Sequence, residues 1–318
     1  MPLKEWANDA AEFTYVRTYS RWIEKLERRE IWYETVERMI KFIQKHRKDV
    51  PQKTIRKIRK YVRNFDVMPS MRMLWAAGEP AERDNTCIYN CAFANIDSIE
   101  SFSECLHILM CGTGFGFNVS RENTEKLPEV PPLTTEQLPD YFVDDSKEGW
   151  ADSVKFLMEA LYNGKHVHFD YSKLRPEGAR LHTMGGRSSG PAPLIRLHHF
   201  IREVFTKAQG RKLKPIECHD ICNQIAEIVV SGGVRRSSQI SLSDIDDDDM
   251  RHAKDWPFPL RRAMANNSAI YIKKPSAARF LREWAELANS GTGERGIFNL
   301  EGARNTAPTR RNRNLIAG

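Results

Sequence analysis

The chain has 318 residues, of which 41% are hydrophobic and 29% charged, and it carries a net charge of +7 at pH 7. This composition is typical of a globular protein with a large core, and no run approaches the roughly eighteen apolar residues of a membrane span. The first residues lack the apolar core of a secretory signal, so we expect a cytoplasmic protein without membrane contact. The positive charge favours anionic ligands, either nucleic acid or nucleotide phosphates.

The spacing of the cysteines is typical neither of a disulfide framework nor of a zinc site. Six cysteines in a chain of this length do not form the disulfide framework of a small secreted protein. Cys87 and Cys91 are spaced CxxxC, as are Cys218 and Cys222, unlike the CxxC pairs usual in zinc sites. We therefore predict no metal site, and we expect redox chemistry if any of these thiols is functional.

Residues 5–66 predict a helical N-terminal region. Apolar residues recur every third or fourth position over residues 22–46, which predicts amphipathic helices. We expect these apolar side chains to face a core: Trp22, Ile31, Trp32, Val36, Met39, Ile40 and Ile43. Another helix follows Pro51, and we interpret its basic outer face as solvated surface rather than a nucleic-acid groove. The composition changes at Val67, so we place a domain boundary there and expect domains of residues 1–66 and 67–318.

Residues 68–146 predict a strand, a helix and a second strand. A turn rich in Gly and Pro precedes a strand-like run that holds Cys87 and Cys91. Helical spacing follows over residues 98–111, and then a strand whose glycines indicate close packing rather than a dinucleotide site. The proline-containing segment 123–146 has little periodicity, so we expect a long surface excursion.

Helices and strands alternate through most of the remaining chain, which predicts an α/β fold with parallel strands. We expect helices from Lys147 and from about Leu194, and a third helix in which Cys218 and Cys222 are buried, neutral residues. The acidic run at 244–249 lacks the spacing of a calcium loop, so we interpret it as a solvated turn. After a last short strand near residue 296, we expect order to be lost.

Between two of these segments lies a loop whose sequence is LHTMGGRSSGPAPL, residues 181–194. Its glycines permit backbone conformations and close approaches that a side chain would block, and its arginine and serines suit a polar, anionic ligand. The lysine of a phosphate-binding Walker loop is absent, which excludes that class of nucleotide hydrolase. The alternative is a flexible surface connection.

Several motifs, in this order along the chain, resemble the N-terminal half of class II, adenosylcobalamin-dependent ribonucleotide reductases. The resemblance covers the chain from about Phe13, is strongest to the monomeric ribonucleoside-triphosphate reductases, and rests on MPSMRMLWAAG, ERDNTCIYNCAF, GTGFGF, DSKEGW, LRPEGARLHTMGGRSSGPAPL, ECHDICNQIAEIVVSGGVRRS, NNSAIY and GERGIFN. It implies an N-terminal helical region followed by the first half of a ten-stranded α/β barrel, ending just before the catalytic finger loop.

The resemblance also implies that the radical-forming cysteine and the catalytic base lie in a C-terminal half that this chain does not contain. We expect that half to be a separate chain or to follow an intein in the gene, and the alternative is that the sequence ends at an arbitrary point. Together the halves would reduce ribonucleotides to 2′-deoxyribonucleotides, with adenosylcobalamin bound by the completed enzyme. The substrate would be a ribonucleoside triphosphate, with a diphosphate left open.

Site residues follow from the matched motifs. Cys91 corresponds to the first reducing cysteine, and Ser70 is a weaker candidate for contact with the substrate phosphate. Asp97 and Ser98 correspond to the residues that contact a deoxynucleotide effector at a helix start. The specificity loop, which links the effector to the substrate base, corresponds to Met184, Gly185, Gly186, Arg187, Ser188 and Ser189.

The partners implied are the C-terminal half, a thioredoxin-like reductant that reopens the disulfide, and a second copy that could complete the effector site. A different function is a basic, non-catalytic nucleic-acid-binding protein, supported by the net charge and by Arg310, Arg311 and Arg313 near the end of the chain. That alternative leaves the glycine and cysteine motifs unexplained.

Overall fold

A computed structural model describes residues 6, 8–181, 187–231 and 237–308 of the protein. The chain divides into two compact units, Met1–Asn90 and Cys91–Gly318. The domain boundary that we placed after residue 66 stays a prediction. Within the described ranges, no helix is both long and apolar enough to cross a membrane.

The first unit is mainly helical. Its helices are α1 (Asp9–Thr18), α2 (Trp32–His46), α3 (Gln52–Arg63), α4 (Met71–Ala76) and α5 (Glu79–Arg83), and its short elements are β1 (Trp22–Ile23), η1 (Glu24–Leu26), β2 (Arg28–Arg29) and η2 (Asn85–Ile88). The core of the unit includes Trp32, Val36, Met39 and Ile40 of α2, which are buried as predicted.

The helix expected from residue 22 begins only at Trp32. The preceding residues form a hairpin in which Trp22 pairs with Arg29, and Glu27 adopts the positive φ of 47° that reverses the chain. The carboxylate of Glu34 accepts a hydrogen bond from the Ile31 backbone N–H at 2.9 Å, which satisfies a free donor at the start of the helix. Trp22 and Ile31 are therefore 42% and 50% exposed, and their assignment to the core was wrong.

The second unit is built on a five-stranded parallel sheet. The strands are β3 (Cys91–Asn95), β4 (Gly114–Asn118), β9 (Gln239–Asp244), β10 (Ala265–Tyr271) and β11 (Gly296–Asn299), and their order across the sheet is β11-β10-β9-β4-β3. The α/β class and the parallel sheet are thus confirmed. Closure of this sheet into part of a ten-stranded barrel stays a prediction.

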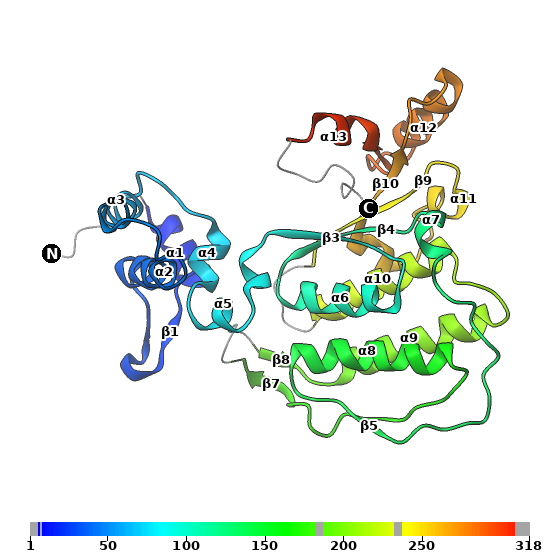
Figure 1. Ribbon diagram of the computed structural model, residues 1–318, viewed down its shortest axis with the longest axis horizontal. Coiled ribbons are helices and arrows are strands. Elements are labelled where there is room, and N and C mark those ends of the chain that lie inside the picture. The colour runs from blue at the N-terminus through cyan, green and yellow to red at the C-terminus, as the bar shows by residue number, and fades with distance from the viewer. Residues whose placement is uncertain (1–5, 7, 182–186, 232–236, 309–318) are drawn as a thin grey trace. The chain divides into compact units, whose positions relative to one another are not determined.

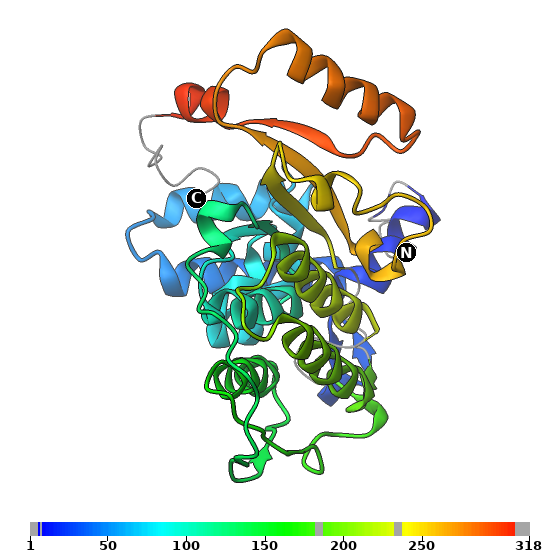
Figure 2. The ribbon, with the colours of Figure 1, turned by 90° about the vertical axis from the view of Figure 1, so that its right-hand side faces the viewer.

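Two helical layers cover one face of this sheet. The helices α6 (Ile99–Met110) and α10 (Pro215–Ser231) lie next to the strands, and α8 (Lys147–Tyr162) and α9 (Ala192–Ala208) lie farther away (Figures 1 and 2). Phe115 and Phe117 of β4 point into the resulting core and are almost completely buried. The smaller elements are α7 (Arg121–Thr124), β5 (Tyr141–Phe142), β6 (Phe169–Asp170), β7 (Glu177–Arg180), β8 (Arg187–Ser189), α11 (Asp248–Arg251), η3 (Leu260–Met264), α12 (Ala277–Asn289) and α13 (Leu300–Thr306).

Two expectations about exposed segments were wrong. The segment 123–146 is not only a surface excursion, because Leu127, Val130 and Val143 are fully buried in the core. Backbone hydrogen bonds fix it there, from Val130 N–H to Arg211 O at 3.0 Å and from Val143 N–H to Asp170 O at 3.0 Å. Order also continues past the last strand into α13, where the Asn299 side chain caps the helix.

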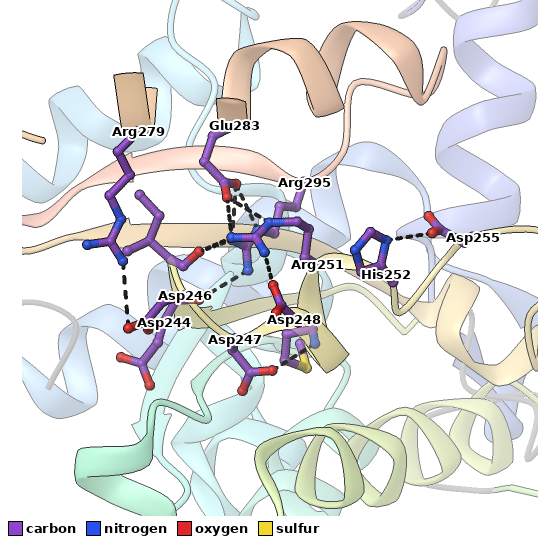
Figure 3. Close-up of polar contacts among 12 residues, drawn as sticks. Asp244, Asp246, Asp247, Asp248, Arg251, His252, Asp255, Arg279, Glu283 and Arg295 are labelled. Carbon is purple, nitrogen blue, oxygen red and sulfur yellow. Dashed lines mark hydrogen bonds and ion pairs between the residues drawn. The ribbon is translucent and has the colours of Figure 1, made fainter. Parts of the chain in front are cut away.

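A buried ion cluster connects the last strands (Figure 3). The carboxylate of Glu283 on α12 is 3% exposed and lies 2.8 Å from an Arg251 nitrogen and 3.0 Å from an Arg295 nitrogen. Arg295 also donates to the backbone oxygens of Asp244 and Ile245 at 3.1 and 2.7 Å, at the carboxyl end of β9. The cluster therefore joins α11, α12 and the start of β11 to β9.

The acidic run takes part in the same region. Asp247 is buried and accepts the Met250 backbone N–H at 2.9 Å at the start of α11, so this residue is not part of a solvated turn. Asp246 is more exposed and lies 3.2 Å from an Arg121 nitrogen. Asp244 accepts the Arg121 backbone N–H at 2.8 Å, and Asp249 lies 3.7 Å from Nζ of Lys214, so the carboxylates of the run have partners within the protein.

We predict that Glu283→Gln destabilises the chain by about 3 kcal/mol, because it leaves Arg251 and Arg295 without their shared buried counter-charge. Urea unfolding followed by circular dichroism measures the change. The matched control is Glu286→Gln on the exposed side of the same helix, which should change stability by less than about 0.5 kcal/mol. Equal unfolding midpoints for the two variants would contradict the role assigned to the cluster.

Candidate functional site

The face of the sheet opposite α6, α8, α9 and α10 carries the candidate site, at the β3–β4–β9 part of the sheet. Phe93, Gly116, Ile240 and Asn266 are register partners across four adjacent strands, and Phe93 and Ile240 are 41% and 51% exposed. Cys91 is exposed two residues before Phe93, so strand alternation places it on the same face, about 7 Å along β3. We call the surface formed by Cys91, Phe93, Ile240 and Asn266 the open face.

Gly116 fits the open face because it lacks a side chain. A Cβ atom at this position would lie 2.7 Å from Cδ2 of Phe93, which is closer than a carbon contact allows. The aromatic ring of Phe93 therefore lies over the backbone of β4. This confirms that a glycine of this strand serves close packing, as its sequence predicted.

The effector candidates lie at the other end of β3. Ser98 is the N-cap of α6, where its hydroxyl accepts the Ser101 backbone N–H at 3.3 Å. The carboxylate of Asp97 lies 3.5 Å from Nζ of Lys126. Because six residues of extended chain span about 20 Å, the structure does not bring Asp97 and Ser98 together with Cys91.

The specificity-loop candidates are only partly described. Met184, Gly185 and Gly186 lie outside the described residues, whereas Arg187, Ser188 and Ser189 form β8, which pairs antiparallel with β7. The Arg187 guanidinium donates to Gly178 O at 3.0 Å, and the Ser188 hydroxyl accepts the Gly190 N–H at 3.0 Å. These donors and acceptors are thus used within the hairpin.

Gly190 at the end of β8 shows why this segment needs glycine. Its φ is +68°, a conformation that residues with a side chain rarely adopt. A Cβ atom would also lie 3.0 Å from the backbone nitrogen of Glu177 on the neighbouring strand β7. The expected close backbone approach is therefore confirmed at this position.

Ser70 belongs to the first unit, where it precedes α4. Its side chain is exposed and makes no capping hydrogen bond to that helix. Its hydroxyl is therefore available for a ligand, and its predicted contact with a substrate phosphate stays a prediction.

Sequence reasoning missed most of the open face. It singled out Cys91 but not Phe93, Ile240 or Asn266. No sequence signal marked them, because the structure alone shows that Gln239 and Ser241 of β9 are buried and that Ile240 between them is exposed. An exposed apolar residue that alternates with buried polar residues indicates a surface that another polypeptide or domain covers.

Two family models match separate parts of the chain. A model described as "B12-dependent ribonucleotide reductase, insertion domain" matches residues 125–205, and a model described as "Ribonucleotide reductase alpha domain" matches residues 3–79. The first match covers the buried segment after α7 together with α8, β6 to β8 and most of α9.

Similar curated proteins carry one description, adenosylcobalamin-dependent ribonucleoside-triphosphate reductase. The protein of Euglena gracilis is 31% identical over 291 residues, which are 84% of this chain and 40% of that protein. The protein of Lactobacillus gasseri is 29% identical, with 92% of this chain and 48% of that protein covered. The chain thus spans less than half the length of these relatives.

A solved structure supports the same relationship. The crystal structure of a B12-dependent, class II ribonucleotide reductase matches with a TM-score of 0.71 and 26% sequence identity, over 82% of this chain and 46% of that chain. The likeness therefore extends over most of the two units and not only over short motifs. The chain belongs to the class II, B12-dependent ribonucleotide reductase family and corresponds to the N-terminal part of its members.

Proposed function

We propose that this chain is part of an adenosylcobalamin-dependent ribonucleoside-triphosphate reductase and that Cys91 is one of its two reducing thiols. The observation that carries the proposal is the place of Cys91 on the open face of the sheet. Of the six cysteines, all within the described ranges, Cys91 is exposed and the other five are buried. Its sulfur is therefore the one that a substrate or a reductant can reach.

The other thiols have a different chemistry. Burial raises the pKa of the Cys218 and Cys222 thiols well above the ordinary value, so both stay protonated and unreactive at neutral pH. Cys87 is 1% exposed and its thiol donates to the backbone oxygen of Asp84 at 3.1 Å. These contacts support structural roles for the three residues.

The proposed reaction needs two facing thiols. The C2′–O bond of the ribose breaks, a C2′–H bond forms, the oxygen leaves as water, and the two thiols become a disulfide. A thioredoxin-like reductant then reopens the disulfide by thiol exchange, through attack on an accessible sulfur. Cys91 supplies one thiol, and we propose that the C-terminal half of the reductase supplies the other.

The open face supports the need for that half. Its exposed Phe93 and Ile240 side chains are a surface that soluble proteins normally cover. On the same side of β3, the buried amide oxygen of Asn95 has no hydrogen-bond partner among the described residues, which costs about 1–3 kcal/mol unless a donor is supplied. We propose that the C-terminal half covers this face and donates a hydrogen bond to Asn95.

We propose adenosylcobalamin as the cofactor because the similar curated proteins are described as dependent on it. Adenosylcobalamin supplies radical chemistry when it is bound to such an enzyme. Two pockets among the described residues, of about 500 and 430 Å³, are lined by α9 with Tyr171 and by α6 with α8, on the helical side of the sheet. We therefore assign no residue of this chain to the cofactor.

The remaining assignments rest on the family. We propose a ribonucleoside triphosphate as substrate, with Ser70 near its phosphate, and a deoxynucleotide effector at Asp97 and Ser98. The start of α6 suits an anionic effector, because its backbone N–H groups carry partial positive charge. A second copy of the chain could complete this effector site.

We predict that Cys91 reacts fastest of the six cysteines when the folded chain is treated with iodoacetamide at neutral pH. Mass spectrometry of quenched time points measures the modification of each thiol. Cys218 and Cys222 should stay unmodified until urea unfolds the chain. Modification of Cys218 at the rate of Cys91 in the folded chain would contradict the assignment.

We also predict that Cys91→Ser abolishes multiple turnovers in the assembled enzyme, because a serine cannot form the disulfide that reduces the ribose. The measurement is deoxynucleotide formed per enzyme with dithiol, adenosylcobalamin and a ribonucleoside triphosphate. Cys222→Ser is the matched control, since it makes the same exchange in the core and should lower stability while turnover per folded molecule is retained. Equal turnover by wild type and the Cys91 variant would refute the role.

A further inference from the structure

The charge of the chain is concentrated in its first unit. Residues 1–90 contain 19 Lys and Arg against 13 Asp and Glu, whereas the other 228 residues contain 30 against 29. The first unit thus carries +6 of the net charge of +7. Such asymmetry between parts of a chain indicates an interaction with a polyanion.

Within the first unit, the charge collects on α3 and the end of α2. Residues 41–63 hold ten Lys and Arg and one acidic residue, Asp49. In α3, Ile55 and Val62 are buried, which fixes the helix face that points inward. The outward-facing residues Lys53, Arg56, Lys57 and Lys60 are all exposed, and we call these four the basic stripe.

The basic stripe is not neutralised by the protein. Among the described residues, none of its four side chains has an acidic partner, unlike neighbouring Arg59, which lies 2.8 Å from a Glu37 oxygen. Arg63 at the end of the helix lies over the ring of Tyr33 instead, at 4.8 Å from its centroid. Four cations on one helix face repel one another, and bound phosphates would relieve that repulsion.

The buried apolar face and the charge spacing of α3 indicate a nucleic acid as the polyanion rather than a membrane surface. A helix that binds a bilayer inserts its own apolar face, whereas Ile55 and Val62 of α3 are buried within the unit. The charges of the stripe recur every three or four residues, which places neighbours about 5–6 Å apart on one face. Tyr61 on the same helix is 45% exposed and could stack on a base.

We propose that the basic stripe of α3 binds the phosphate backbone of nucleic acid without sequence preference. This is a function in addition to the proposed reductase activity, and it involves neither Cys91 nor the open face. The proposed surface does not include the basic residues near the end of the chain. Those residues, Arg310, Arg311 and Arg313, lie outside the described residues.

Fluorescence anisotropy with a labelled 20-base-pair duplex of random sequence tests the proposal on the full chain. Four phosphate contacts give a slope of log affinity against log salt of about −3.6, so raising salt from 50 to 200 mM should weaken binding about 150-fold. Replacing Lys53, Arg56, Lys57 and Lys60 together with Gln should flatten the slope by about 3.6, to near zero, and weaken binding at 50 mM salt by about 10⁴-fold, which removes detectable binding. Gln has nearly the same helix propensity, so the fold should be retained, which circular dichroism checks.

The matched control removes four exposed charges from the second unit, by replacing Arg196, Lys207, Lys273 and Lys274 with Gln. It should bind like the wild type, since it has the same net charge as the stripe variant but keeps the stripe. Equal binding by the two variants, or no binding by the wild type at 50 mM salt, would overturn the proposal. Tighter binding to anionic phospholipid vesicles than to the duplex would also overturn it, in favour of a membrane surface.

Discussion

The central constraint of this structure is that α6, α8, α9 and α10 all lie on one face of its parallel sheet, while on the other face the described residues bury Leu242 and Ile270 beneath Leu300 of α13 and leave Cys91, Phe93 and Ile240 exposed. The chain passes from β3 to β4, β9, β10 and β11 in one direction across the sheet, and right-handed crossovers then place the connecting helices on the same side. Phe115 and Phe117 enter the core beneath α6 and α10, and alternation turns Cys91 and Phe93 to the other side. A shift of one residue in β3 would bury the thiol and remove the proposed site.

The same sheet separates the two proposed nucleotide-related sites. Cys91 begins β3, whereas Asp97 and Ser98 follow its carboxyl end and lead into α6. A nucleotide bound near Asp97 would therefore not contact Cys91 directly. It would affect the reaction at Cys91 through β3, through the neighbouring strands or through the proposed C-terminal half. The buried Glu283 cluster joins the opposite edge of the sheet to α12, because Arg295 precedes β11 and pairs with Glu283.

Local patterns predicted the parts of this fold that depend on local interactions. Periodicity located α6, α8, α9 and α10, and the small residues of β4 indicated its close packing. The hairpin before Trp32 was missed because Trp22 and Ile23 also fit a helical spacing, and only the turn at Glu27 separates the two outcomes. The Glu283 cluster could not be predicted, since Arg251 is 32 residues away in sequence and its role depends on burial. Exposure of Ile240 likewise depends on which face the helices cover.

In the proposed reaction, Cys91 on the open face of the sheet is a reductant that each turnover oxidises. The most direct test is thiol mapping by mass spectrometry after the chain, assembled with the rest of the reductase, converts one equivalent of ribonucleoside triphosphate without external reductant. The account predicts that Cys91 loses its free thiol to a disulfide in proportion to the deoxynucleotide formed, while Cys218 and Cys222 stay reduced. Product formation with Cys91 still present as a free thiol would contradict it.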